Sequence, residues 1–438
     1  MGLIIGSAIF IVPATIAGRL HAMGPIVLVW VLGGFLTLIG ALTLAELSAV
    51  LPSAGGPYAY LRHSFGRFWA FLFTWNHYFI NTAGTIAAVS VAFATYLGSF
   101  IPALSPGNHF YSRAFSVAGH RLTFALGWTE VVAMALIAIV TLVNVRGVRF
   151  GGWVMNLLTA TKILALLGLI VAAFVSGKGS SANLLPWWPE HWTHETTAAF
   201  GLSMIAVLWA FDGWISVTFT AGEMRDPERN IPRALIIGTV GVIALYLGAN
   251  LAYAWVMPLN AMAGSPRVAA DVARLVLGPV GATLVIVGIL CSTVGTANGA
   301  LLAIPRSIYG AAEDGAFPAR FARVHPQFHT PAVAIATLGV WGGLLTLSGT
   351  YDQITSYVVF GSWFFYALTI LSVIVLRRVM PEVPRRYKAL GYPWAPLLFA
   401  AVAGWFLYNT VVEDPRSAAI GIGLLALGLP FYYRWKPR

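Results

Sequence analysis

The sequence predicts an all-α integral membrane protein with twelve transmembrane helices. Of its 438 residues, 58% are hydrophobic and 9% are charged, and the mean hydropathy is +0.79. Soluble domains carry about 25% charged residues, so this composition excludes a soluble fold. Apolar runs of about 20 residues, the length that crosses ~30 Å of hydrocarbon, recur along the whole chain. They leave no room for a separate soluble domain.

Twelve apolar runs define the predicted spans in chain order. The first six are Met1–Leu20, Gly24–Leu51, Phe68–Ile101, Phe124–Val145, Gly152–Val175 and Thr197–Ala221. The other six are Ala234–Met257, Val280–Ile304, Ala332–Ser348, Ile354–Leu376, Trp394–Val412 and Ala418–Tyr433. Pro and Gly inside these runs are compatible with membrane helices, because neighbouring helices satisfy the freed backbone groups.

The distribution of lysine and arginine predicts the orientation. With twelve spans both termini lie on one side, and eighteen of the 26 basic residues fall on that side, including Lys436 and Arg438 near the end of the chain. The other side has seven: Arg19, Arg113, Arg121, Lys178, Arg267, Arg274 and Arg416. Since cytoplasmic loops carry the excess of basic residues, we expect a multi-pass protein of the cell (inner) membrane with both termini cytoplasmic.

The same composition argues against other classes of protein. The basic residues are spread over short loops, so the net charge of +11 does not indicate a nucleic-acid partner; the partner they predict is membrane lipid. The single cysteine, Cys291, lies in an apolar span, which excludes a disulfide framework. The nine histidines are scattered and no catalytic motif is present, so we expect no enzyme activity, no cofactor and no metal site. The first span does not resemble a cleavable signal peptide.

A first helix break is predicted at Gly6-Ser7-Ala8. Gly6 has no Cβ and Ser7 is small, so the backbone can open there and expose its N–H groups. The helix that resumes at Ile9 offers its positive N-terminal end, which suits a carboxylate. A close helix-packing seam of small residues is the alternative interpretation. Only five residues precede Gly6, roughly 7 Å of helix, so we expect the working protein to have a longer amino terminus.

A second break is predicted at Phe211-Asp212-Gly213-Trp214, at the corresponding place in the second half of the chain. An acid in a membrane span costs about 2.5–3.5 kcal/mol on insertion scales, so Asp212 is expected to be functional or to bond backbone freed by Gly213. Carbonyls exposed here would accept hydrogen bonds from an ammonium. One break therefore offers donors and the other acceptors, and an α-amino acid zwitterion needs both. Trp209 and Trp214 flank the break and are candidates to close over a substrate.

Lys162 is the basic residue that we place in the middle of a span, with no carboxylate nearby in the sequence. Its ammonium must point into the protein. There it can occupy the place of a bound Na⁺, release a proton, or form an inert pair with helix-end carbonyls. On the eighth span the hydroxyl of Ser292 or of Thr296 could face Lys162 or an ion, and Ser292 is the candidate partner, although hydroxyls in membrane helices usually bond to their own turn. Other polar residues lie at depth or near an interface: Glu46, Asn76, His77, Asn81, Glu130, Thr293 and Thr296.

Several strings resemble the amino acid–polyamine–organocation superfamily, and within it the L-type subfamily that includes bacterial serine/threonine exchangers. The resemblance covers nearly the whole chain. The strings are Ile5–Phe10, Ala45–Leu47, Pro52–Tyr58, Ala210–Trp214, Gly222–Ala234, Pro305-Arg306, Val324–Pro326, Thr330-Pro331, Arg386–Lys388 and Gly391–Pro393.

This resemblance implies a LeuT-type fold with broken helices 1 and 6. Residues 1–438 would form one transporter domain, with residues 1–176 as the first five-helix repeat, 197–376 as its inverted second repeat, and 394–433 as two additional helices. Spans one to five and six to ten would form this 5+5 inverted repeat around a midplane site.

The resemblance also implies roles for individual residues. In the first break, Ile5 to Ala8, the substrate carboxylate would bind at Gly6, Ser7 and Ala8. Carbonyls around Phe211 would bind the amine and Trp209 would gate the site. Lys162, with Ser292 as its partner, would replace a sodium ion. Ala8 stands where glycine is more usual, which favours small substrates. No accessory subunit is implied, since the eukaryotic linkage uses an extracellular cysteine.

The sequence therefore predicts sodium-independent transport of amino acids, as exchange of small or neutral L-amino acids by alternating access. A proton-coupled symporter that uses Lys162 is the nearest alternative. An ion channel would need a continuous polar pore and an amino acid sensor would need a signalling domain; neither is present in the sequence.

Overall fold

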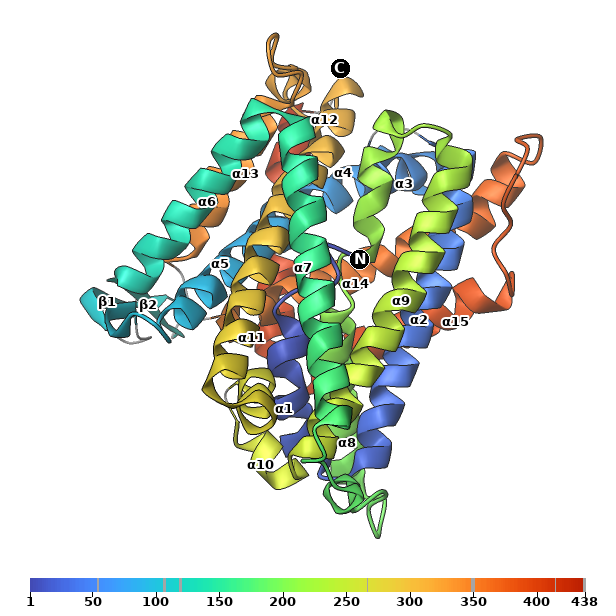
Figure 1. The fold of residues 1–438 in the computed structure, drawn as a ribbon. Helices are drawn as coiled ribbons and strands as arrows, with labels where there is room; N and C mark the ends of the chain where they lie inside the picture. Colours follow the sequence, from blue (N-terminus) through green and yellow to red (C-terminus); the bar gives the residue numbers. More distant parts are fainter. Residues whose placement is uncertain are drawn as a thin grey trace. The chain divides into compact units, whose positions relative to one another are not determined.

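Helices form most of the described part of the protein, as the composition predicts. The computed structural model describes residues 1–52, 55–104, 108–117, 120–265, 267–347, 351–413 and 415–435 (Figure 1). The chain divides into two compact units, each assembled from separate stretches of sequence. Ser53 and Ala54 of the Pro52–Tyr58 string, Ser348 at the end of a predicted span, and Lys436 and Arg438 of the basic residues lie outside the described residues.

The first unit comprises Met1–Leu38, Asn156–Trp214 and Ile237–Gly295. Its complete helices are α1 (Ala8–Leu20), the 3-10 turn η3 (Ser181–Leu184), α8 (His194–Ala210) and α10 (Leu259–Ala263). It also contains parts of α2 (Met23–Val50), α7 (Val148–Val175), α9 (Pro227–Val256) and α11 (Val268–Ala303). Helix α1 packs against α8 and α10 within this unit (Figure 1). Every residue proposed above for substrate or ion binding belongs to it.

The second unit comprises Ile39–Met155, Ile215–Ile236 and Thr296–Arg438. Its helices up to α6 are α3 (Pro57–Phe65), α4 (Arg67–Trp75), the π-helix η1 (Asn76–Thr82), α5 (Ala83–Leu97), η2 (Pro102–Leu104) and α6 (Trp128–Arg146). The later ones are η4 (Trp214–Glu223, apart from its first residue), α12 (Pro305–Glu313), η5 (Ala319–Ala322), α13 (Ala332–Leu345), α14 (Tyr351–Val379), α15 (Trp394–Glu413), α16 (Pro415–Ala426) and α17 (Leu429–Trp435). Helices α6 and α13 pack side by side (Figure 1).

Each predicted span contains a helix, although residues 1–7, 98–101 and 124–127 at the ends of three spans are not helical. Ten helical segments there are long and apolar enough to cross a membrane, and the two shorter apolar helices α1 and α13 coincide with the remaining predicted spans. The eighth span is preceded by a kink inside α11, where Gly278 has φ +73° and Pro279 follows it. Since proline lacks an N–H and clashes with the preceding turn, the membrane helix begins there.

The prediction for the start of the fourth span was wrong. Residues 124–127 belong to a two-stranded antiparallel hairpin of β1 (His109–Val117) and β2 (His120–Gly127), in which Arg113 pairs with Phe124. The run from 109 to 127 contains Phe, Tyr, Thr and Val, residue types that are enriched in strands, and its apolar end belongs to β2 and does not extend the helix. Helix α6 instead starts at Trp128, where the Glu130 carboxylate accepts a hydrogen bond from the Gly127 N–H at 2.7 Å.

Candidate functional site

The chain is irregular at its start and becomes helical only at α1. Residues 2–7 form turns and bends, and α1 begins at Ala8, one residue before the predicted point. The Ser7 side chain does not cap this helix, and within the first turn the Phe10 N–H donates to the Ser7 carbonyl at 3.1 Å, so the helix start lacks the usual side-chain cap. Ile5, Gly6, Ser7 and Ala8 are buried. A buried, uncapped helix N-terminus is suited to a negatively charged group.

The second break lies where the sequence predicts it. Helix α8 ends at Ala210, Phe211 closes its last turn, and the 3-10 helix η4 begins at Trp214. Gly213 has φ +97°, and a Cβ on it would lie 3.0 Å from the carbonyl oxygen of Leu3, in the irregular segment of residues 2–7 that contains the first break. Glycine is needed here for its backbone conformation and because the two unwound segments approach each other closely.

Asp212 bonds the backbone at Gly213, as the structural alternative predicts. Its Oδ1 accepts a hydrogen bond from the Gly213 N–H at 2.8 Å, and its own N–H donates to the Trp209 carbonyl at 3.0 Å. Trp209 and Asp212 are half-buried, whereas Phe211 and Trp214 are buried. The carboxylate thus stabilises the turn between α8 and η4.

Lys162, on α7, is fully buried at 0% exposure and reaches the first break. Its Nζ donates to the Gly2 carbonyl at 2.5 Å and to the Ile5 carbonyl at 2.6 Å. Gly295 of α11 lies beside it, where a Cβ would be 3.5 Å from Nζ. The ammonium is therefore coordinated by carbonyl oxygens of an unwound segment, which is the kind of environment that a cation occupies in transporters with broken helices.

Ser292 of α11 joins the same contact. Its hydroxyl donates to the Ile5 carbonyl at 3.1 Å, so this oxygen accepts from Lys162 and Ser292 together. The neighbouring Thr293 bonds back to the Ile289 and Leu290 carbonyls of its own helix. Ser292, the predicted partner of Lys162, therefore contacts the first break, whereas the described hydrogen bonds of Thr293 lie within its own helix.

Tyr246 is a site residue that sequence reasoning missed. It is fully buried on α9, and its hydroxyl lies 2.9 Å from the Ile4 carbonyl and 3.1 Å from the Ala210 carbonyl, one beside each break. Its ring packs against Phe211 with centroids 5.1 Å apart, and Trp30 of α2 packs against both rings. Tyrosine is common in the apolar runs of this chain, so nothing in the sequence sets Tyr246 apart.

The remaining polar residues at depth lie in the second unit. His77 belongs to the π-helix η1, where its ring stacks on Phe73 and contacts Phe219, with centroids 5.3 and 5.0 Å apart. Asn81 donates to the Ser362 hydroxyl at 2.5 Å. These contacts pack η1 against its neighbours within this unit.

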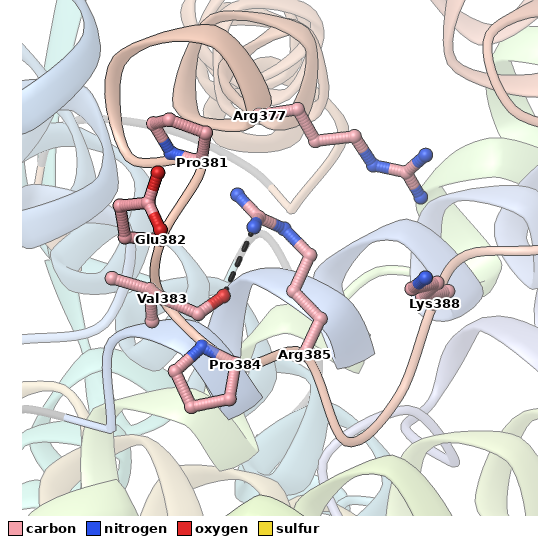
Figure 2. Close-up of a pocket in the computed structure, with 7 residues that line it drawn as sticks. All are labelled: Arg377, Pro381, Glu382, Val383, Pro384, Arg385 and Lys388. Atoms are coloured by element: carbon pink, nitrogen blue, oxygen red, sulfur yellow. Dashed lines mark hydrogen bonds between the residues drawn. The ribbon is translucent and has the colours of Figure 1, made fainter.

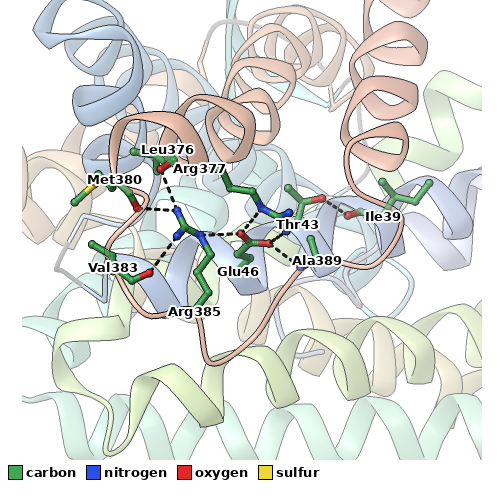
Figure 3. Close-up of polar contacts among 9 residues, drawn as sticks. All are labelled: Ile39, Thr43, Glu46, Leu376, Arg377, Met380, Val383, Arg385 and Ala389. Carbon is green, nitrogen blue, oxygen red and sulfur yellow. Dashed lines mark hydrogen bonds and ion pairs between the residues drawn. The ribbon is translucent and has the colours of Figure 1, made fainter.

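Glu46 is also in the second unit and is a buried carboxylate on α2. It accepts hydrogen bonds from Arg377 Nε and Nη2 at 2.8 and 2.7 Å and from the Ala389 N–H at 2.7 Å, while Arg385 Nε lies 3.3 Å away (Figure 3). This cluster joins α2 to the end of α14 and to the loop that follows it.

Comparison with known proteins gives one family and several full-length relatives. The family model described as amino acid permease matches residues 1–425. The chain is 29% identical to the serine/threonine exchanger SteT of Bacillus subtilis, over 100% of this chain and 94% of that protein. It is 29% identical to the b(0,+)-type amino acid transporter 1 of Mus musculus, over 99% of this chain and 85% of that protein. The human large neutral amino acids transporter small subunit 2 is also 29% identical, over 99% of this chain and 78% of that protein.

Proposed function

Because the chain belongs to the amino acid permease family, we propose that it exchanges small or neutral L-amino acids across the cell membrane without sodium. The relatives named above are exchangers or transporters of amino acids, which supports this substrate class. Ala8, in the first break, favours the smaller members of the class. The observation that supports sodium independence is the position of Lys162. Its ammonium donates to the Gly2 and Ile5 carbonyl oxygens, where a sodium ion would otherwise bind.

The two breaks bind opposite ends of the amino acid in this proposal. The carboxylate binds at Gly6, Ser7 and Ala8, because the uncapped start of α1 presents N–H donors and the positive end of its dipole. The amine binds at carbonyls around Phe211, because α8 ends there and its last carbonyls lack helical partners. Ile5, Asp212, Gly213 and Trp214 shape the two breaks, and Trp209 closes over the bound substrate.

Tyr246 keeps the two breaks at a fixed spacing. Its hydroxyl lies within hydrogen-bond distance of one carbonyl beside each break, so the carboxylate site and the amine site keep their spacing. Lys162 and Ser292 fix Ile5 in the same way from α7 and α11. Alternating access then carries this preformed site from one side of the membrane to the other.

We propose that the chain forms a single transporter domain, with repeats at residues 1–176 and 197–376 and two further helices at residues 394–433. Both termini are cytoplasmic, and no accessory subunit is required, since the one cysteine, Cys291, lies within α11. Transport, and no enzymatic reaction, is the activity.

Proteoliposomes test the exchange directly. Vesicles containing the purified protein are loaded with serine or left empty, and uptake of labelled serine is measured with sodium or choline outside. We expect uptake only into loaded vesicles and at equal rates in the two salts. A panel of twenty amino acids as competitors then defines the substrates.

The nearest alternative function is proton-coupled symport with Lys162 as the proton carrier. It predicts uptake into empty vesicles when the outside is made acidic. That result would replace exchange with symport, and a sodium requirement would remove the role given to Lys162. A conductance without amino acid would indicate a channel instead.

A further inference from the structure

A basic depression of about 410 Å³ lies at the end of α14 in the second unit. It is lined by Arg377, Pro381, Glu382, Val383, Pro384, Arg385 and Lys388 (Figure 2). The segment connects two helices long and apolar enough to cross the membrane, which end at Val379 and begin at Trp394. The depression therefore opens at a membrane surface, which the distribution of basic residues predicts to be the cytoplasmic one.

Two of its guanidinium groups are held rigidly. Arg377 forms a bidentate pair with the buried Glu46 and lies 3.7 Å from the centre of the Tyr392 ring. Arg385 donates to the Val383, Leu376 and Met380 carbonyls at 3.0–3.1 Å and approaches Glu46 at 3.3 Å (Figure 3). One carboxylate faces two guanidinium groups, so the wall of the depression keeps a positive charge.

Lys388 adds a second positive charge and is available to a ligand. Its side chain is exposed and takes part in no ion pair among the residues that the structure describes. Glu382 is the one acid in the lining, and in Figure 2 it lies on the opposite side from Arg377 and Lys388. The depression thus has a cationic side and an acidic side.

Exposed apolar side chains surround this basic segment. Val379 is 62% exposed, Leu390 is 68% exposed and Trp394, at the start of α15, is 77% exposed. Tryptophan is enriched at membrane–water interfaces, and apolar side chains beside it are stabilised by contact with acyl chains. An anion with a hydrocarbon tail fits this combination better than a soluble anion does.

We propose that this depression binds the phosphate headgroup of an anionic phospholipid, with Lys388 and Arg377 on the phosphate and the acyl chains against Val379 and Trp394. Basic pockets beside cytoplasmic helix ends recognise lipid headgroups in this way. The contact is independent of the amino acid site, and it would hold the loop between α14 and α15 at the membrane surface.

Native mass spectrometry of the purified full-length protein tests the proposal. The protein is equilibrated with equal amounts of phosphatidylglycerol and phosphatidylcholine, and the retained lipids are counted. We expect phosphatidylglycerol to be retained preferentially. Lys388→Gln should lower that retention about fivefold, the factor that one basic residue contributes near an anionic surface. Glu382→Gln should raise it, because it removes the opposing charge.

The matched control is Arg225→Gln, which removes one exposed positive charge from another loop of the same unit. Phosphatidylglycerol retention in this variant should equal that of the wild type. Equal losses in Lys388→Gln and Arg225→Gln would overturn the proposal, as would a loss in Glu382→Gln. Inorganic phosphate is the final competitor: if it displaces the lipid at millimolar concentration, the site serves a soluble anion and the lipid proposal is wrong.

Discussion

Lys162 and Glu46 are both buried charges on membrane helices, and their partners differ in kind. Lys162, at 0% exposure, donates to two neutral backbone carbonyls of an unwound segment. Glu46, at 1% exposure, faces two guanidinium groups and a backbone N–H. No ion pair joins Lys162 to a carboxylate within the described part of the chain.

The difference explains why one charge suits transport and the other suits structure. Carbonyl dipoles accept any cation of suitable size, so the partners of Lys162 remain satisfied if the ammonium is replaced by an ion. The guanidinium groups around Glu46 are full charges, and a buried ion pair that loses one member leaves the other uncompensated. We therefore expect substitutions at Glu46 to alter stability and substitutions at Lys162 to alter transport.

The largest expected effect is that of Glu46→Gln on stability. The amide keeps the shape of the side chain but leaves Arg377 and Arg385 without their countercharge, and breaking a buried pair costs about 3–5 kcal/mol. Thermal unfolding in detergent should show a clear loss. Glu228→Gln is the control, because Glu228 pairs at 2.9 Å with an Arg386 that is 76% exposed, and such a surface pair contributes about 0–1 kcal/mol. Equal losses of thermal stability in the two variants would mean that the stabilising contribution of the Glu46 cluster does not depend on its burial.

The next largest effect is that of Lys162→Ala on exchange. Hydrogen bonds to a charged group contribute about 1.5–3 kcal/mol, so we expect serine exchange to fall about 10- to 100-fold. Lys178→Ala is a close control: its Nζ also donates to two carbonyls, of Leu275 and Val276, but the side chain is exposed. That variant should exchange at nearly the wild-type rate. If Lys162→Ala does so as well, the ammonium is an inert packing group.

External sodium tests whether Lys162 replaces a sodium ion in the same exchange assay. If the ammonium substitutes for a sodium ion, external sodium should restore part of the exchange lost in Lys162→Ala, because the Gly2 and Ile5 carbonyls no longer accept from the ammonium and can bind the ion. Choline should not restore it. Restoration by external acid instead of sodium would favour the proton-coupled alternative.

The sequence predicts the buried position of Lys162 but does not predict the ion pairs of Glu46. A single lysine within a long apolar run must point into the protein, and Gly-Ser or Asp-Gly within such runs predicts broken helices, so Lys162 and both breaks were found. Glu46 is recognisable in the sequence as a polar residue at depth, but its arginine partners follow it by more than 300 residues and have the sequence features of ordinary loop charges. Long-range pairing of this kind leaves no local pattern. The hairpin of β1 and β2 was not predicted, because the apolar residues 124–126 adjoin the apolar run of α6 and a short apolar run does not distinguish a strand from a helix.

Tyr246→Phe has a smaller expected effect that tests the link between the breaks. The change removes one hydroxyl that lies 2.9 Å from the Ile4 carbonyl and 3.1 Å from the Ala210 carbonyl, and leaves the ring packing intact. A net hydrogen bond contributes about 0.5–1.5 kcal/mol, so the KM for serine should rise about 2- to 12-fold. Tyr253→Phe, seven residues further along α9 and equally buried, should change KM less. A larger effect at Tyr253 would contradict the positioning role of Tyr246.

The smallest expected effect separates two adjacent hydroxyls on α11. Ser292→Ala removes a donor to the Ile5 carbonyl, and since Lys162 still donates to that oxygen, the loss of exchange should stay at about two- to tenfold. Thr293→Val removes a hydroxyl that bonds only within its own turn in the described contacts, and such bonds contribute little to a helix. We expect no change in exchange from Thr293→Val. If the two variants behave alike, the contact of Ser292 with the first break does not contribute to transport, and Lys162 alone maintains the Ile5 carbonyl in place.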